Sequence, residues 1–148
     1  MPSDNQMAGL LTPEQLQKFA QEIAISEAHK AAEKAKKAKE QLKAERKAFM
    51  ERELRSDAMQ YLMTAVKQLA ERGMHEFLVV KFSAQFLSDG GRRVNNFEPD
   101  WPDSLQGFAK RAYDYYQEYL KPAGYRLRAQ ILEYPNGKFG DVGLFLCW

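Results

Sequence analysis

Residue types that commonly carry out chemistry are few in this chain and do not cluster. His29 and His75 lie far apart, and neither has a second His, Cys or carboxylate at the spacing of metal ligands. The one cysteine, Cys147, lies among apolar residues of an expected strand, which indicates a buried, unreactive thiol rather than a nucleophile. The sequence therefore predicts no catalytic residue, no metal site and no cofactor, and we expect a protein that is not an enzyme.

The segment SDGGRRVNNFEPDWPD, residues 88–103, is the strongest candidate for a ligand site. Asp89 is expected to begin a turn, and Asp103 to cap a following helix. The glycines lack the spacing of a phosphate-binding loop. The rest of the segment lies between an expected strand and an expected helix, a position where anions bind in many α/β proteins. The candidate ligand-binding residues are Arg92, Arg93, Asn95, Asn96 and Trp101. The alternative interpretation is a solvated loop in which the tryptophan packs inward.

A second candidate surface lies on a later strand. Arg126 and Arg128 alternate with apolar residues and therefore project from the same strand face, with Tyr134 following in the sequence. Arginines beside an aromatic ring can bind single-stranded nucleic acid or a protein partner. The same arginines could instead form ion pairs with Glu133 or Asp141, so this surface is the weaker of the two candidates.

The elements that position these residues begin with a long helix. Thr12-Pro13-Glu14-Gln15 matches a capping box with proline at the first helical position. No glycine or proline follows until Gly73, and residues 30–47 consist almost entirely of alanine, lysine, glutamate and other helix-forming residues. The sequence predicts a charged helix over residues 13–55, preceded by a disordered tail over residues 1–12.

The apolar stripe of this helix is thin. One set of apolar residues recurs at heptad spacing, and an earlier set follows a different phase. The first set is Ala28, Ala31, Ala35, Ala38, Leu42 and Phe49, and the second is Leu16, Phe19 and Ile23. We expect an alanine-rich coiled coil through which the protein associates with itself or with a protein partner. The alternative is a solvated helix held by ion pairs.

Residues 30–47 also suggest a nucleic-acid interpretation. They contain eight Lys and Arg against three acids, and lysines can neutralise phosphates without reading sequence. However, the window contains no aromatic residue, and its glutamates are interleaved with the lysines as ion-pair partners. Nucleic-acid binding through 30–47 and Arg126/Arg128 is therefore the alternative rather than the favoured interpretation.

Residues 56–148 have the pattern of a small α/β domain. Apolar periodicity predicts two helices and three strands, and Pro135-Asn136-Gly137 predicts a tight turn between the last two strands. The helices are expected at 57–72 and 103–121, and the strands at 76–82, 125–131 and 142–148. A bend is expected near Ser56-Asp57 if the two N-terminal helices are separate.

The connections between these elements predict the topology. A helical crossover makes the first two strands parallel, and the turn makes the last strand antiparallel to its predecessor. The last strand is the most apolar, so we expect it in the centre. The fold class is α+β: a long N-terminal helix, then an α-β-α-β-β domain whose three-stranded mixed sheet resembles a split βαβ unit with helices on one face.

The strand at 76–82 has apolar residues on both of its expected faces. Simple alternation would point Phe77 and Val79 away from Leu78, Val80 and Phe82. Two helices can cover only one face of a sheet, so the other face would need a second cover. Either the N-terminal helix folds back over this face or a second copy of the sheet covers it, and a homodimer is the arrangement that we expect.

Composition agrees with this interpretation. The 148 residues are 45% hydrophobic and 28% charged, carry a formal net charge of +2, and contain no apolar run long enough for a membrane span. The first residues lack the features of a signal peptide, and one cysteine cannot form an internal disulfide. We therefore expect a cytoplasmic, homodimeric protein-interaction or assembly protein. A small regulatory domain with an anion site in the 88–103 loop remains a further alternative.

Overall fold

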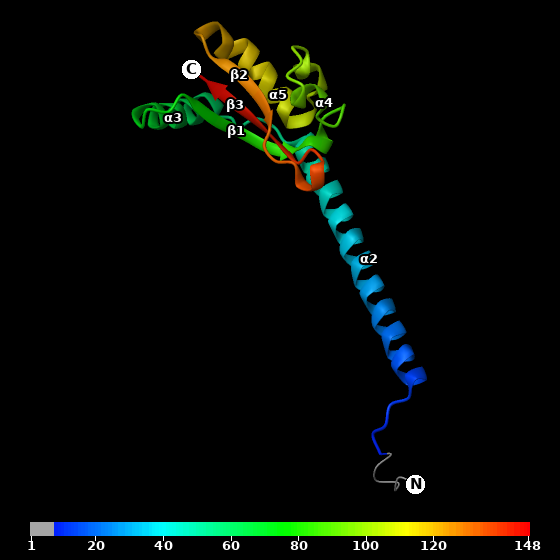
Figure 1. Ribbon diagram of the computed structural model, residues 1–148. Coiled ribbons are helices and arrows are strands. Elements are labelled where there is room, and N and C mark those ends of the chain that lie inside the picture. The colour runs from blue at the N-terminus through cyan, green and yellow to red at the C-terminus, as the bar shows by residue number, and fades with distance from the viewer. Residues whose placement is uncertain (1–7) are drawn as a thin grey trace. The chain divides into compact units, whose positions relative to one another are not determined.

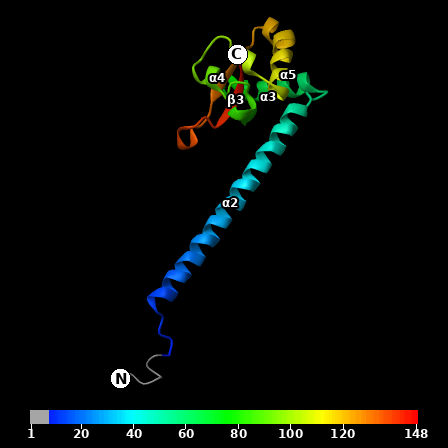
Figure 2. The ribbon, with the colours of Figure 1, turned by 90° about the vertical axis from the view of Figure 1, so that its right-hand side faces the viewer.

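The computed structural model describes residues 8–148, which divide into two compact units at the bond between Glu45 and Arg46. Most of the tail expected at residues 1–12 lies outside the described residues. The first unit consists of most of helix α2, Pro13–Glu51, whose last turns belong to the second unit. Figures 1 and 2 show α2 as one unbroken helix. No helix within 8–148 combines the length and apolar character needed to cross a membrane.

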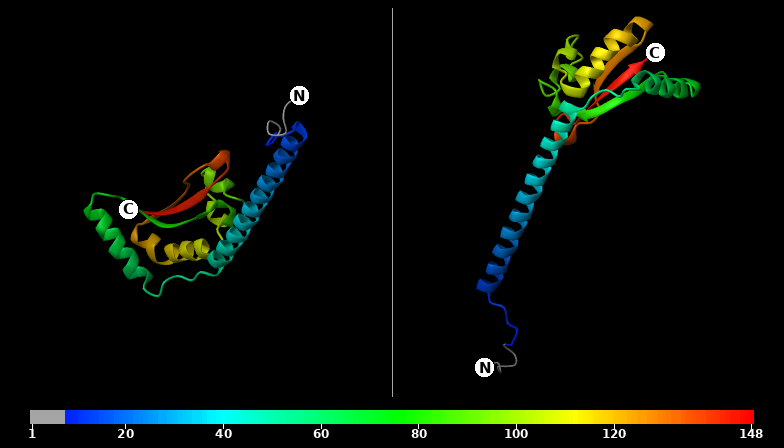
Figure 3. Two further views of the ribbon diagram at one scale, coloured as in Figure 1. Left: turned by 90° about the horizontal axis from the view of Figure 1, so that it is seen from below. Right: turned by 180° about the vertical axis from the view of Figure 1, so that it is seen from behind.

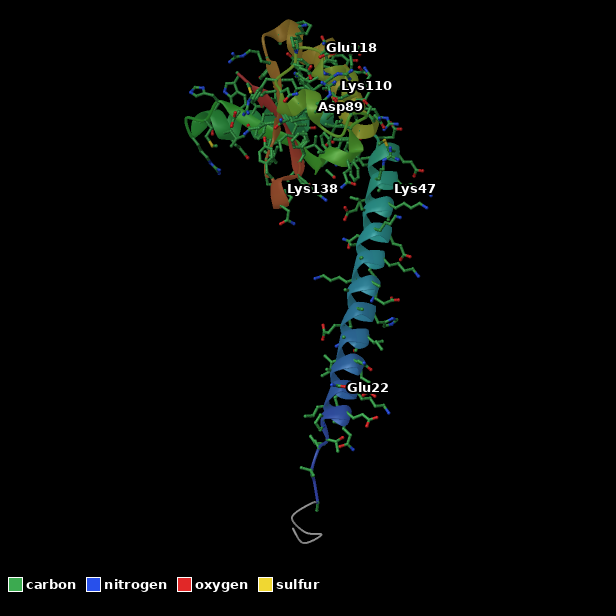
Figure 4. The ribbon with its side chains drawn as sticks, turned by 45° about the vertical axis from the view of Figure 1, so that its right-hand side comes forward. Glu22, Lys47, Asp89, Lys110, Glu118 and Lys138 are labelled. Atoms are coloured by element: carbon green, nitrogen blue, oxygen red, sulfur yellow. The ribbon has the colours of Figure 1, made fainter. Side chains whose placement is uncertain are left out.

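The start of α2 confirms the predicted capping box. The backbone N–H of Gln15 donates to Thr12 Oγ1 at 3.2 Å, and the backbone N–H of Thr12 donates to Gln15 Oε1 at 2.9 Å. These two bonds satisfy groups that a helix N-terminus otherwise leaves unpaired. Every residue from 8 to 41 is exposed, and Figure 4 shows side chains such as Glu22 extending away from the helix.

The C-terminal end of α2 is part of the second unit's core. Phe49 is buried, and its ring centroid lies 4.9 Å from that of Phe82 and 5.2 Å from that of Phe86. The ring of Phe108 lies 6.4 Å away in an edge-on arrangement. Assigning Phe49 to the coiled-coil stripe was therefore wrong. Its side chain packs in the aromatic core of the second unit and is not available for contact with another helix.

Helix α2 ends at Glu51, earlier than the expected residue 55. Its last turn contains no basic residue of its own, and Arg111 from a later helix supplies the missing donors. Arg111 Nη1 donates to the carbonyl oxygens of Met50 at 2.8 Å and Arg52 at 3.0 Å. These carbonyls would otherwise lack partners at a helix C-terminus. The chain then turns at residues 52–57 and enters α3, Ala58–Glu71, so the two helices are separate.

The sheet has the predicted strand order. Strands β1 (Glu76–Ser83), β2 (Arg126–Ile131) and β3 (Asp141–Cys147) are arranged β1-β3-β2, with β3 in the centre (Figure 1). Both hydrogen-bonded ladders are antiparallel. Consequently β1 and β2 run parallel to each other but are not neighbours, as in a split βαβ unit. The sheet is therefore antiparallel throughout rather than mixed, because the central β3 is antiparallel to both of its neighbours.

A β-bulge changes which side chains of β1 face the helices. Phe77 pairs with Leu146 and Val80 pairs with Leu144. Val79, between Leu78 and Val80, has no partner on β3 and is the bulged residue. Leu144 and Leu146 project to the same face, and so Phe77 lies on the same face as Val80. The expectation that Phe77 points opposite to Val80 and Phe82 was therefore wrong, because simple alternation does not include the bulge. Of the apolar residues in β1, Leu78 is the one on the open face.

Helices cover one face of this sheet, as predicted. Leu62 and Val66 of α3 form one buried cluster with Leu146 of β3 and with Tyr116 and Leu120. Figure 3 (left) shows α3 and α5 on the same side of the strands. Helix α5, Gly107–Tyr115, continues as a π-helical turn, Tyr116–Leu120.

The helix predicted over residues 103–121 begins at Gly107, not at residue 103. Asp103 and Ser104 form part of a 3-10 turn, Trp101–Ser104. Ser104 is fully buried and its Oγ donates to the Trp101 carbonyl at 2.7 Å, while no side chain caps α5. The predicted capping box at Asp103 was therefore wrong, because Asp103 and Ser104 belong to a separate 3-10 turn in which Ser104 is buried.

Candidate functional site

The second unit contains a cavity of about 120 Å³ between the helices and the sheet. Its floor consists of side chains from all three strands: Val79, Leu127, Leu144 and Leu146. Its walls come from α3 and from α5 with the π-helical turn. Leu144 and Leu146 are fully buried, so the part of the floor that is accessible from the cavity comes from the half-buried Val79 and Leu127. The fold therefore leaves a small apolar pocket above the centre of the sheet.

Two arginines from the connection between α2 and α3 line the same cavity. The guanidinium carbon of Arg52 lies 4.0 Å from the ring centroid of Phe108, and that of Arg55 lies 4.4 Å from the ring centroid of Tyr61. All three of Arg52, Arg55 and Tyr61 are exposed, which places them where the cavity opens. Cations on aromatic faces are held by the negative potential of the ring. The opening thus carries two positive charges in defined positions.

The charges of the two arginines differ in how far they are compensated. Arg55 forms a two-bond ion pair with Asp57, at 2.9 and 3.1 Å, which lowers the pKa of that carboxyl. Arg52 forms no ion pair with any of the described residues 8–148. Among the described residues, none that lines the cavity is acidic. The cavity therefore presents net positive charge at its opening.

Two tyrosines complete one wall of the cavity. Burial raises the pKa of the Tyr115 hydroxyl and, with a smaller opposing effect from a backbone hydrogen bond, that of Tyr116. Tyr116 uses its hydroxyl to donate to the Tyr125 carbonyl at 3.0 Å. Both side chains are therefore neutral at physiological pH, and they add no negative charge to the wall.

The 88–103 segment forms its own closed network of bonds. Arg92 pairs with Glu98 at 3.1 Å, and Arg93 pairs with Asp100 at 3.3 Å. Asp89 accepts from the backbone N–H groups of Gly91 and Arg93, each at 3.0 Å, as the expected turn requires. Burial alone would raise the pKa of this carboxyl, but these bonds and the adjacent arginines lower it. Arg92 and Arg93 begin a short helix, α4 (Arg92–Asn95), and both guanidinium groups already face carboxylates of the same segment.

The other candidate residues of this loop also have partners. Asn95 donates from its side-chain amide to Asn96 Oδ1 at 3.2 Å and accepts from the Tyr134 hydroxyl at 2.8 Å. Trp101 packs edge-on against Tyr113, with ring centroids 6.0 Å apart. The structure therefore brings Tyr134 to the 88–103 loop, although the sequence grouped it with Arg126 and Arg128.

Arg126 and Arg128 lie on the open face of the sheet, at the other end of β2 from Tyr134. Arg128 forms an ion pair with Glu76 and stacks on Phe145, with its guanidinium carbon 4.4 Å from the ring centroid. The three residues grouped by sequence therefore do not form one platform. Arg126 begins β2 and is exposed.

The isolated histidines and cysteine form no centre in the structure. Within residues 8–148 no three His, Cys, Asp or Glu residues are arranged to hold a metal ion. Cys147 is half-buried on the open sheet face, where its thiol contacts the Phe145 carbonyl at 3.7 Å. The expectation of a buried thiol was therefore wrong, because Cys147 projects to the face of the sheet that the helices do not cover.

Sequence reasoning did not identify Arg52, Arg55, Tyr61 or Tyr115 as parts of one site. The available signal was local: Arg52 and Arg55 lie three residues apart, directly after the end of α2 and before the start of α3. Their convergence with Tyr115 depends on how α5 packs beside α3, which no spacing in the sequence specifies. No protein-family model, no curated protein and no solved structure matches this chain.

Proposed function

We propose that this chain is a protein-interaction protein that self-associates through the first unit, the helix over residues 13–45. The observation that carries the proposal is the exposure of its apolar side chains. Leu16, Phe19 and Ile23 are 50%, 47% and 63% exposed, although they share one side of the helix. Large apolar side chains gathered on an exposed helix face are typical of a surface that another helix covers.

The open face of the sheet supports self-association less well. Its apolar residues are few: Leu78 and Leu132 are 41% and 37% exposed, and they meet Phe145 above Gly143. Arg128 covers one side of Phe145. Because the bulge turns Phe77 toward the helices, this face has little apolar area left to bury. The helix is therefore the surface that we favour for a homodimer.

The two halves of the helix differ in side-chain size. Bulky residues occupy the first half, around Leu16 to Ile23, and alanines occupy the stripe of the second half, from Ala28 to Ala38. Alanine leaves space between helices, and a bulky side chain fills such a space. Two copies in antiparallel orientation would pack the bulky half of each helix against the alanine half of the other.

The charges of the two halves favour the same orientation. Residues 13–29 contain one lysine and three glutamates, a net charge of −2, whereas residues 30–45 contain six lysines and three glutamates, a net charge of +3. A parallel pair would align like charges, and an antiparallel pair aligns opposite ones. We therefore propose an antiparallel helix pair between two copies of the chain.

The test measures solution mass by sedimentation for the full chain and two matched variants. Ile23→Glu places a charge in the proposed interface. Ile25→Glu makes the same change two residues later, about 200° around the helix, at a side chain that is also exposed (70%). We expect a dimer for the original chain and for I25E, and a monomer for I23E. A monomeric original chain would contradict the proposal.

Orientation is tested with single-cysteine chains on a Cys147→Ser background. Gln17→Cys and Gln41→Cys place thiols near opposite ends of the helix. An antiparallel pair gives a disulfide-linked dimer only when the two chains are mixed, whereas a parallel pair links each chain to itself.

Nucleic-acid binding through the lysines of residues 30–47 is the competing function. It predicts that the chain binds mixed oligonucleotides with an affinity that falls steeply as salt rises. Salt-dependent binding by a monomeric chain would favour this function over self-association.

A further inference from the structure

We propose that the cavity above the sheet binds a small monocarboxylate with an apolar body. This inference concerns the second unit and does not depend on the proposed self-association of the helix. It combines three properties of the cavity: its volume, its apolar floor and the two arginines at its opening.

The volume limits the size of the ligand's body. A cavity of about 120 Å³ is somewhat smaller than an apolar cavity of about 150 Å³ that accommodates benzene. The enclosed part of a ligand is therefore at most about six carbons in size, which excludes the base and sugar of a nucleotide. The opening allows part of the ligand to remain outside.

The floor and walls determine the chemistry of that body. Leu127, Leu144 and Leu146 form much of the floor, and Phe108 contributes an aromatic wall. Such a surface gains free energy from apolar atoms, and the few polar groups of the lining are the tyrosine hydroxyls of the wall and the opening. A sugar or a free phosphate would leave this surface uncovered, so the body of the ligand is a hydrocarbon.

The opening determines the charge of the ligand. Arg52 and Arg55 flank it, and none of the described side chains that line the cavity is acidic. Arg52 has an aromatic ring on one side and forms no ion pair within the described residues 8–148, so its N–H donors remain available for an anion. A planar guanidinium matches a carboxylate in geometry and can donate two parallel hydrogen bonds to it. Because Arg55 is already paired with Asp57, Arg52 is the residue that we assign to the carboxylate.

The experiment titrates the full chain with hexanoate and follows backbone amide resonances by NMR. Hexanol and hexylamine serve as matched probes that keep the six-carbon body and change the head group. A ligand of this size is expected to bind with a Kd of about 1 mM. We expect hexanoate to shift the resonances of cavity residues such as Leu127 and Leu146, with tenfold weaker binding of hexanol and none of hexylamine.

Three variants separate the contribution of the cavity volume to ligand binding from that of the Arg52 charge. Ala112→Leu fills the cavity from α5 and is expected to weaken hexanoate and hexanol alike, about tenfold or more. Arg52→Met retains the side chain's apolar stem and removes its charge, so it is expected to weaken hexanoate about tenfold and leave hexanol unchanged. Arg72→Met makes the same change at an exposed arginine outside the cavity and is expected to change neither.

Several results would overturn the proposal. One is the absence of shifts at cavity residues with hexanoate at about 10 mM, ten times the expected Kd. Others are equal binding of hexanoate and hexylamine, or an equal effect of R52M and R72M. If A112L fails to fold, as judged by its thermal transition, the comparison of R52M with R72M alone decides the question.

Discussion

Gly107 lies directly against the backbone of Met50. A Cβ atom on Gly107 would stand 2.8 Å from Met50 Cα and 2.9 Å from the Phe49 carbonyl oxygen, and Gly107 has a φ of +57°. Both the close approach and the left-handed backbone require glycine. This contact is where α5 begins and α2 ends, so one residue without a side chain allows these two elements of the second unit to meet.

Gly107→Ala is expected to destabilise the protein by about 2–4 kcal/mol, because backbone atoms rather than a flexible side chain must move. Gly124→Ala provides the control, since Gly124 also has a positive φ but has open space around it. This second change is expected to cost only about 1 kcal/mol of backbone strain. Urea unfolding of the two variants measures the difference, and equal costs would show that the contact with Met50 is unimportant.

Phe49→Ala is expected to lower the free energy of unfolding by about 3–5 kcal/mol, because it empties the centre of an aromatic cluster. Phe97→Ala removes the same number of atoms from a side chain that is 79% exposed, and is expected to change stability by less than about 0.5 kcal/mol. Thermal unfolding at fixed protein concentration compares them. A small effect at Phe49 would place the end of α2 outside the core.

Arg111→Met is expected to destabilise the protein by about 1.5–3 kcal/mol, the usual range for hydrogen bonds that involve a charged group. The variant keeps the apolar stem but leaves the carbonyls of Met50 and Arg52 without these donors. Lys110→Met, at the neighbouring residue, removes an exposed ion pair with Asp114 and is expected to cost under about 1 kcal/mol. Hydrogen exchange of the last amides of α2 should increase in the first variant only.

Asp89→Asn is expected to reduce stability by about 1 kcal/mol at neutral pH, since Asp89 holds the 88–103 loop through two backbone N–H groups. The folded protein lowers the pKa of this carboxyl. Its charge therefore contributes stability that is present above the unfolded pKa, about 3.9, and is lost as pH falls through the folded value. The two proteins should differ in unfolding free energy above about pH 5 and converge in more acidic solution. A difference that does not vary with pH would exclude a contribution from the charge.

The elements that were predicted well are those specified by neighbouring residues. The Thr12–Gln15 capping box, α3 and the three strands follow from periodicity and turn chemistry within a few residues. The central position of β3 followed from its apolar character. These signals act over short distances or through general rules of topology, and so they are readable from one sequence.

The errors occurred where a distant contact overrode a local signal. Phe49 fits a heptad stripe, but Phe82, Phe86 and Phe108 bury it. The Asp103 box fits a helix start, but Ser104 is buried in another turn. The bulge in β1 reverses an alternation that the residues Phe77 to Phe82 otherwise suggest. In each case tertiary packing supplied more free energy than the local preference did.

The features of the candidate site also divide into those that neighbouring residues specify and those that tertiary packing specifies. The sequence by itself determined the helix composition, the strand pattern and the polar character of the 88–103 loop, because each depends on residues close together in the chain. Only the tertiary structure decided that Arg92 and Arg93 face carboxylates of their own loop, and that Arg52 and Arg55 flank an apolar cavity. A cavity is the space that packed elements leave between them, and that space depends on the distance and angle between α3, α5 and the sheet.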